Sequence, residues 1–198
     1  MTSPWARALG TDFEQLDAGL RTYFSEIPAG SVGRGSGVFT VVGTPRRWLW
    51  PVLAVLARDS IVFPVFERDV PFTVVNRRGP AGTVRATRIF QLASGERRML
   101  DETGITGVGL VDRLGARGIV ATTLRPSVLA DGSLRLDSTG VTLRIGRIRL
   151  PLGCFSPRVR LSERREGDVQ RVSLVLDAPA FGRLYEYEGH FTFQIEPE

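Results

Sequence analysis

The sequence has no lysine, a single cysteine (Cys154) and a single histidine (His190). One cysteine cannot form an intrachain disulfide or a cysteine-based metal site, and one histidine excludes a histidine-rich metal site. A Ser-His-Asp triad would have to use His190, and no Gly-x-Ser-x-Gly motif accompanies it. Dinucleotide-binding and Walker-type glycine motifs are absent as well, so we expect neither a metal nor a cofactor.

Long hydrophobic runs are also missing. The most apolar stretch, residues 48–57, is far too short to span a bilayer. The first seven residues are not followed by the apolar segment of a signal peptide. We therefore expect a soluble, cytoplasmic protein with no membrane span.

The basic residues carry little information about partners. All 26 of them are arginines, and the formal net charge is +5. A basic chain is compatible with nucleic-acid binding, but these arginines are scattered and often flank acids, as in residues 163–166. Arginine without lysine is typical of GC-rich codon usage. We expect no nucleic-acid partner and keep a basic nucleic-acid-binding barrel only as an alternative.

The clearest pattern in the chain is an alternation of side chains over residues 183–195. Tyr185, Tyr187 and Phe191 share one face with further apolar residues, whereas the other face is mostly polar. This period of two predicts a strand with one buried face, and a shift of one residue would place glutamates in the core.

Two helices are expected in the first third of the chain, with a strand over residues 38–42 between them. Residues 12–24 have apolar side chains at helical spacing, with Asp12 as N-cap and Gln15 three residues later. Residues 45–57 follow Thr44 as N-cap and are apolar nearly all round. Such a helix is buried, plugs the end of a barrel, or contacts a lipophilic ligand.

The glycine-rich stretch at residues 33–37 lies between a predicted helix and a predicted strand. A phosphate-binding loop needs the opposite order, a strand before and a helix after. A tight turn leading into a sheet accounts better for these glycines.

From residue 60 onward the pattern is strand and turn. No helical period long enough for a parallel crossover occurs there, so the strands are expected to be antiparallel. The candidate strands are 60–66, 70–77, 82–92, 97–101, 105–112, 117–124, 132–137, 139–149, 158–165, 169–177 and 183–195. Turn residues separate them, among them Gly104 and the two-residue hairpin signal Gly167-Asp168. We predict a mainly β fold, an antiparallel meander closing into a lipocalin-like barrel or half-barrel, with one domain over residues 1–198.

Short motifs along the chain resemble the bacterial family of domains of unknown function called DUF4166. The matching residues are Ala8-Leu9-Gly10, Asp12-Phe13, Leu16, Leu20-Arg21, Gly33-Arg34-Gly35, Gly37, Arg68-Asp69-Val70-Pro71, Leu150-Pro151-Leu152, Glu163, Pro179, Gly182, Tyr187 and Gly189. The resemblance implies a domain often fused behind a short-chain-dehydrogenase-like domain, and hence an accessory role to an oxidoreductase. A copy standing alone is expected to have a task of its own.

Carboxylates, tyrosines and tryptophans are the remaining candidates for a site. Glu67 and Asp69 flank Arg68, and a carboxylate pair on one face can share a proton, although a solvated strand end is the alternative. Tyr187 is the candidate hydrogen-bond donor to a substrate carbonyl, and a packed core tyrosine is the alternative. The candidate ligand-binding residues are Trp48, Trp50, Tyr185, Phe191 and Phe72.

An aromatic-lined barrel without a known catalytic constellation suggests two functions. The first is a cofactor-free cyclase or isomerase that folds a polyene or polyketide-like molecule into a reactive shape, in which Tyr187, Asp69 and Glu67 take part. The second is a non-catalytic carrier of a lipophilic molecule, or an accessory domain. In both cases the partner is a lipophilic small molecule, and the oligomeric state is open, a homodimer included.

Overall fold

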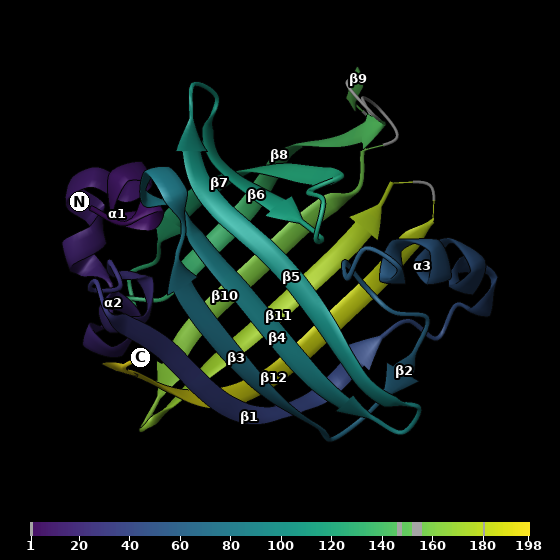
Figure 1. Cartoon of the computed structure of the whole chain (residues 1–198), viewed down its shortest axis with the longest axis horizontal. Coiled ribbons are helices and arrows are strands. Elements are labelled where there is room, and N and C mark those ends of the chain that lie inside the picture. Colours follow the sequence, from purple (N-terminus) through teal and green to yellow (C-terminus); the bar gives the residue numbers. More distant parts are fainter. Residues whose placement is uncertain (1, 146–147, 152–155, 180) are drawn as a thin grey trace.

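The computed structural model describes residues 2–145, 148–151, 156–179 and 181–198, which are mainly β (Figure 1). Cys154 lies outside the described residues. The strands are β1 (Ser31–Gly43), β2 (Phe66–Glu67), β3 (Val70–Arg78), β4 (Val84–Leu92), β5 (Gly95–Thr106), β6 (Gly109–Leu114), β7 (Val120–Val128), β8 (Leu134–Ile145), β9 (Ile148–Pro151), β10 (Arg158–Glu166), β11 (Val169–Ala178) and β12 (Gly182–Pro197).

The sheet closes on itself. Its strands follow the order β10-β11-β12-β1-β3-β4-β5-β6-β7-β8, and β8 also pairs with β10, where Leu134 lies opposite Glu163. Ten of the described strands thus form a closed antiparallel barrel, with β2 and β9 outside the ring. The predicted fold class is confirmed, and closure leaves no unpaired edge in the ring.

The central strand pair is β12 with β1. Tyr185, Tyr187 and Phe191 are buried, as the alternation over residues 183–195 predicts. Phe191 lies opposite Gly37 of β1, and Tyr187 lies opposite Val42. A Cβ added to Gly35 would lie 2.6 Å from the Thr192 carbonyl oxygen and 3.2 Å from Phe191.

The glycine-rich stretch therefore has a different place from the predicted one. Residues 33–37 lie within β1 rather than in a turn leading into the sheet. Each of these glycines pairs with a residue of β12, and Gly37 lies opposite Phe191. Their missing side chains make room for the aromatic rings of the neighbouring strand.

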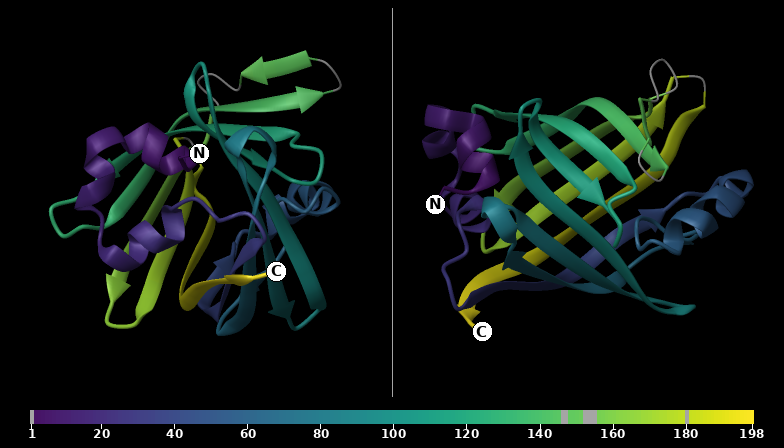
Figure 2. Two further views of the ribbon diagram at one scale, coloured as in Figure 1. Left: turned by 60° about the vertical axis from the view of Figure 1, so that its left-hand side comes forward. Right: turned by 45° about the horizontal axis from the view of Figure 1, so that its top comes forward.

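Two short helices and a 3₁₀ turn cover one end of the barrel (Figure 2). They are α1 (Pro4–Leu9), the turn η1 (Gly10–Gln15) and α2 (Ala18–Phe24). Ser3 caps α1 by accepting from the Ala6 amide, and Asp17 caps α2 by accepting from the Gly19 amide. The single helix predicted over residues 12–24 is thus wrong, because Leu16 is extended and ends the first segment. Ser3 followed by Pro4 is a typical helix start, but the spacing of apolar residues alone does not reveal it.

The other helix, α3 (Trp50–Ala57), follows the turn η2 (Arg47–Leu49) and projects at the opposite end (Figures 1 and 2). Leu49 and Leu53 are buried in the core, whereas Trp48, Val52 and Val55 are all more than half exposed. The helix that was expected to be buried, to plug the barrel or to contact a ligand is therefore buried on one face only. A helix of two turns packs only one side against the barrel.

Several predicted strand boundaries also differ. Residues 60–65 are not a strand, since Ser60 has a positive φ, although Phe63 and Val65 pack in the core. The predicted strands 132–137 and 139–149 are joined in β8, which ends at Ile145, and residues 148–149 belong to β9. Residues 146–147 lie outside the described residues. The turn after β5 lies at residues 107–108 instead of Gly104.

Candidate functional site

A cavity of about 140 Å³ lies inside the barrel. It is lined from β3–β8, β10–β12, the N-terminal helices and the segment after α3. Trp5 and Phe24 contribute from the helices at one end, and Ile61 and Val62 from the other segment. The cavity therefore occupies the interior that the closed sheet encloses.

Most of its wall is apolar and follows from strand register. Tyr187, Leu174, Leu161 and Leu136 lie opposite one another on four adjacent strands. All four line the cavity, so this row of paired residues, which we call the apolar rung, supplies a continuous apolar surface that includes the Tyr187 ring.

The Arg88–Asp101 ion pair lies in the facing wall, between β4 and β5. Their side chains are 19% and 7% exposed, so the pair is largely shielded from bulk water. Burial raises the pKa of Asp101, and the charge of Arg88 opposes that rise. A pair in this setting needs both partners, since either charge alone would be desolvated without compensation.

Asp112 is the second carboxyl of this wall. The Thr103 hydroxyl, directly across from it on β5, donates to its Oδ1 over 3.1 Å. Burial raises the pKa of Asp112 to about 7, and the neighbouring Asp101 carboxylate adds to the rise. The Asp112 carboxyl therefore gains or loses its proton near neutral pH.

Glu163 is the third carboxyl of the cavity and stands on β10, beyond the apolar rung. It is 5% exposed, and the Gln170 amide donates to its Oε2. Burial raises the pKa of Glu163 to about 7, although the Gln170 bond and the charge of Arg88 both lower it. Two weak acids with similar proton affinity thus face one apolar space.

Neutral polar groups complete the polar part of the wall. Tyr23 on α2 lies beside the Asn76 side chain of β3, and burial raises the pKa of Tyr23 to about 12. Burial also raises the pKa of Tyr187, so both hydroxyls stay protonated donors. Asn76 is 3% exposed, and its Oδ1 has no hydrogen-bond partner among the described residues.

Of the site residues expected from the sequence, Tyr185 and Tyr187 line the cavity. Phe72 and Phe191 are buried in the aromatic core, with their rings 5.8 Å apart, and are not in the lining. The structure brings these four residues into one barrel interior.

The other expected site residues lie outside the lining. Trp48 packs against Phe181 and is 56% exposed, and the Trp50 indole donates to the Thr44 carbonyl. Glu67 accepts from the Ala93 amide at the end of β2, and Asp69 is an exposed residue with a positive φ. The positive φ of Asp69 breaks the alternation that was expected to put the two acids on one face.

The charged residues of the cavity were missed, although the sequence contains a signal for two of them. Glu163 follows Val159 and Leu161 at steps of two, and Arg88 follows Val84 and Ala86 in the same way. A charged residue that continues the apolar face of a strand points inward.

Within the described residues, no group of three or more His, Cys, Asp or Glu side chains is arranged to hold a metal ion.

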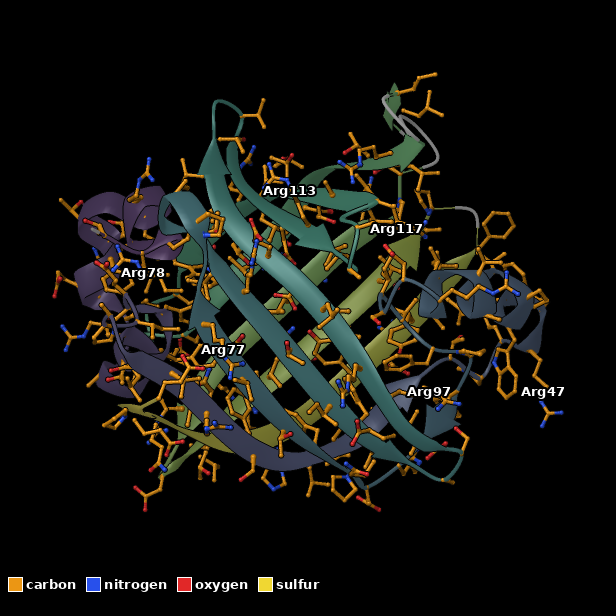
Figure 3. All side chains as sticks on the ribbon, in the orientation of Figure 1. Arg47, Arg77, Arg78, Arg97, Arg113 and Arg117 are labelled. Carbon is orange, nitrogen blue, oxygen red and sulfur yellow. The ribbon has the colours of Figure 1, made fainter. Side chains whose placement is uncertain are left out.

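The arginines are distributed around the molecule. Figure 3 labels six of them, in the turn η2, on β3, on β5, on β6 and in the turn after β6. Several arginines pair with acids on the surface, for example Arg34 with Glu196 and Arg85 with Glu102.

Among the residues that the structure describes, no helix is both long and apolar enough to cross a bilayer.

Comparison with known proteins adds the family and nothing more specific. The model of a family described as a domain of unknown function (DUF4166) matches residues 16–191. No curated protein and no solved structure matches the chain significantly.

Proposed function

The chain belongs to the DUF4166 family of domains of unknown function, and from its interior we propose a cofactor-free isomerase or cyclase acting on a small lipophilic molecule. The observation that carries this proposal is the cavity itself, in which Asp112 and Glu163 face an apolar space with pKa values of about 7. General acids and bases work best when their pKa lies near the working pH.

The volume of the cavity limits what it can hold. A cavity of about 150 Å³ lined by apolar side chains accommodates benzene, and the cavity in this barrel measures about 140 Å³. One six-membered ring or an equally short chain therefore fits. A longer polyene or polyketide-like substrate would place only its reacting part inside, or would displace lining side chains.

The chemistry follows from the polar part of the wall. A carboxyl kept neutral by apolar surroundings can donate a hydrogen bond to a carbonyl oxygen that gains negative charge. Protonated Asp112 is such a donor, the Tyr187 hydroxyl is a second donor, and Glu163 is the base. The proposal assigns the acid–base roles to these groups, since Glu67 and Asp69 lie at the surface.

The alternative is a carrier that binds the same molecule without changing it. The apolar rung and the aromatic packing around it support binding equally well under both proposals. The difference lies in the buried acids, because a carrier of an apolar molecule has no use for ionisable groups that are costly to bury.

Product formation separates the two functions. Small cyclic and linear ketones are incubated with the protein and followed by NMR, in wild type, Tyr187→Phe and Asp112→Asn. Isomerase or cyclase activity predicts turnover above the spontaneous rate, reduced roughly ten- to a thousandfold in either variant while folding stays intact. The exposed Glu188 provides the matched control, Glu188→Gln, which should behave like wild type. Binding of ketones without product in any variant would favour the carrier.

A further inference from the structure

Asn76 presents an unused hydrogen-bond acceptor to the cavity. Its side chain lines the cavity and is almost fully buried, yet Oδ1 has no partner among the described residues. Buried acceptors without partners cost free energy, and native proteins keep few of them. A bound molecule that carries a hydroxyl or an N–H group would satisfy this atom.

The carboxyls are each engaged on one oxygen only. Thr103 donates to Oδ1 of Asp112, and Gln170 donates to Oε2 of Glu163. Within the described part of the chain, no hydrogen bond engages the second oxygen of either acid, and both side chains line the cavity. One oxygen on each acid is therefore available to a ligand.

The charges in the wall argue against an anionic ligand. Among the described residues of the lining, Arg88 is the single basic one, and it is already paired with Asp101. A carboxylate or phosphate would meet Asp112 and Glu163 without a free cation to balance it. A neutral molecule with one donor and one acceptor fits the wall better.

We propose that the cavity binds a small, neutral, enolisable hydroxy ketone, with Asn76 accepting from the hydroxyl, Asp112 and Tyr187 donating to the carbonyl, and Glu163 acting as the base. This inference rests on the proposed function and specifies its substrate class. Asn76 also lies across from Ala86, which pairs with Asp101, so the hydroxyl site and the acidic wall are neighbours on adjacent strands.

The step balances without a cofactor. The Glu163 carboxylate takes the proton from the carbon next to the carbonyl, and the C–H electron pair forms the carbon–carbon double bond of an enediol. Asp112 gives its proton to the carbonyl oxygen. Glu163 then gives its proton to carbon, and the Asp112 carboxylate takes a proton back from one enediol hydroxyl. Loss of the proton that Asp112 had given restores the starting ketone. Loss of the other hydroxyl proton, with protonation of the former carbonyl carbon, moves the ketone to its neighbour, so the result is an isomerisation with no net oxidation.

Hydrogen exchange at carbon tests the base directly. The protein is mixed with 2-hydroxycyclohexanone in deuterium oxide, and loss of the α-proton signal is followed by NMR. We expect exchange well above the buffer rate in wild type and in Glu188→Gln, and a reduction of roughly a hundredfold or more in Glu163→Gln. Exchange at the buffer rate in wild type, or equal rates in wild type and Glu163→Gln, would overturn the inference.

A second measurement tests the hydroxyl site without depending on turnover. Affinities for 2-hydroxycyclohexanone, cyclohexanone and cyclohexylamine are measured in wild type and Asn76→Leu. The hydroxy ketone should bind roughly tenfold more tightly than cyclohexanone in wild type, and this preference should vanish in Asn76→Leu. The absence of a preference in wild type, or the tightest binding for the amine, would contradict the assignment.

The two proposals fail differently. If cyclohexanone binds in the cavity and other ketones are converted, but the hydroxyl brings no preference, only the substrate class is wrong. If none of these molecules binds to wild type, the proposed function fails together with the inference.

Discussion

The Thr103 hydroxyl donates a hydrogen bond to Asp112 over 3.1 Å, between directly opposite residues of β5 and β6. A bond of this kind favours the carboxylate, yet burial and the neighbouring Asp101 raise the pKa of Asp112 to about 7. The bond therefore orients the acid while the surroundings set its proton affinity. The remaining oxygen of Asp112 is left to meet a ligand in the cavity.

Stability should depend on pH through Glu163. Its pKa is raised from 4.5 to about 7 in the folded chain, so the native state holds the proton over a range in which the unfolded state has lost it. This contribution is complete below the unfolded pKa and is lost as pH rises to about 7, by at most about 1.4 kcal/mol per pH unit. Urea unfolding at several pH values should show a steeper decline in wild type than in Glu163→Gln. Parallel curves would show that Glu163 is not buried as a neutral acid.

Breaking the Arg88–Asp101 pair should be costly, whereas removing both charges should not. Arg88→Met leaves a buried carboxylate without its partner, and we expect a loss of about 3–5 kcal/mol in unfolding free energy. The double variant Arg88→Met/Asp101→Leu should recover most of that loss, because no unpaired charge remains. Chemical denaturation of both variants checks this, and equal stability of the single and double variants would contradict it.

The glycines of β1 should not tolerate a side chain. A Cβ at Gly37 would lie 2.0 Å from the His190 carbonyl oxygen, so Gly37→Ala must move the β1–β12 pairing. We expect a loss of about 2 kcal/mol or more, by analogy with overpacked cores. Gly140 in β8 is the matched control, since nothing lies within 4 Å of its added Cβ. Thermal unfolding should show a large shift for Gly37→Ala and almost none for Gly140→Ala; equal shifts would refute the packing role.

Tryptophan fluorescence should report ligand binding through one residue. Trp5 lines the cavity and is 9% exposed, whereas Trp48 is 56% exposed at the other end of the barrel. A lipophilic ligand should change the emission of wild type and of Trp48→Phe, but not that of Trp5→Phe. Titration with cyclohexanone provides the measurement. A signal that persists in Trp5→Phe and disappears in Trp48→Phe would place the ligand near α3.

The β-barrel fold could be predicted because the sequence features that indicate it are local. Period-two alternation in β10, β11 and β12 correctly places Leu161, Leu174 and Tyr187 on inward faces. The turn at residues 167–168 likewise joins β10 to β11 as its composition predicts, with Glu166 opposite Val169. Each of these features depends only on neighbouring residues in the chain.

The polar site could not be assembled in the same way. An inward direction for Arg88 or Glu163 follows from alternation, but the partner of each depends on register between strands. The turn after β5 lies three residues beyond the expected Gly104, and this turn decides that Thr103 faces Asp112. Which end of the barrel each tryptophan covers depends on helix docking, which composition does not specify.

Filling the cavity is the most direct test of the central claim, that the barrel interior is a ligand site. Ala86 is 6% exposed and lines the cavity between Asn76 and Asp101. Ala86→Leu would place a larger apolar side chain in that space, whereas Ala54→Leu on the exposed part of α3 provides a control. Calorimetric titration with cyclohexanone should show binding to wild type and Ala54→Leu, and at least roughly tenfold weaker binding to a folded Ala86→Leu. Undiminished binding to folded Ala86→Leu would contradict the claim.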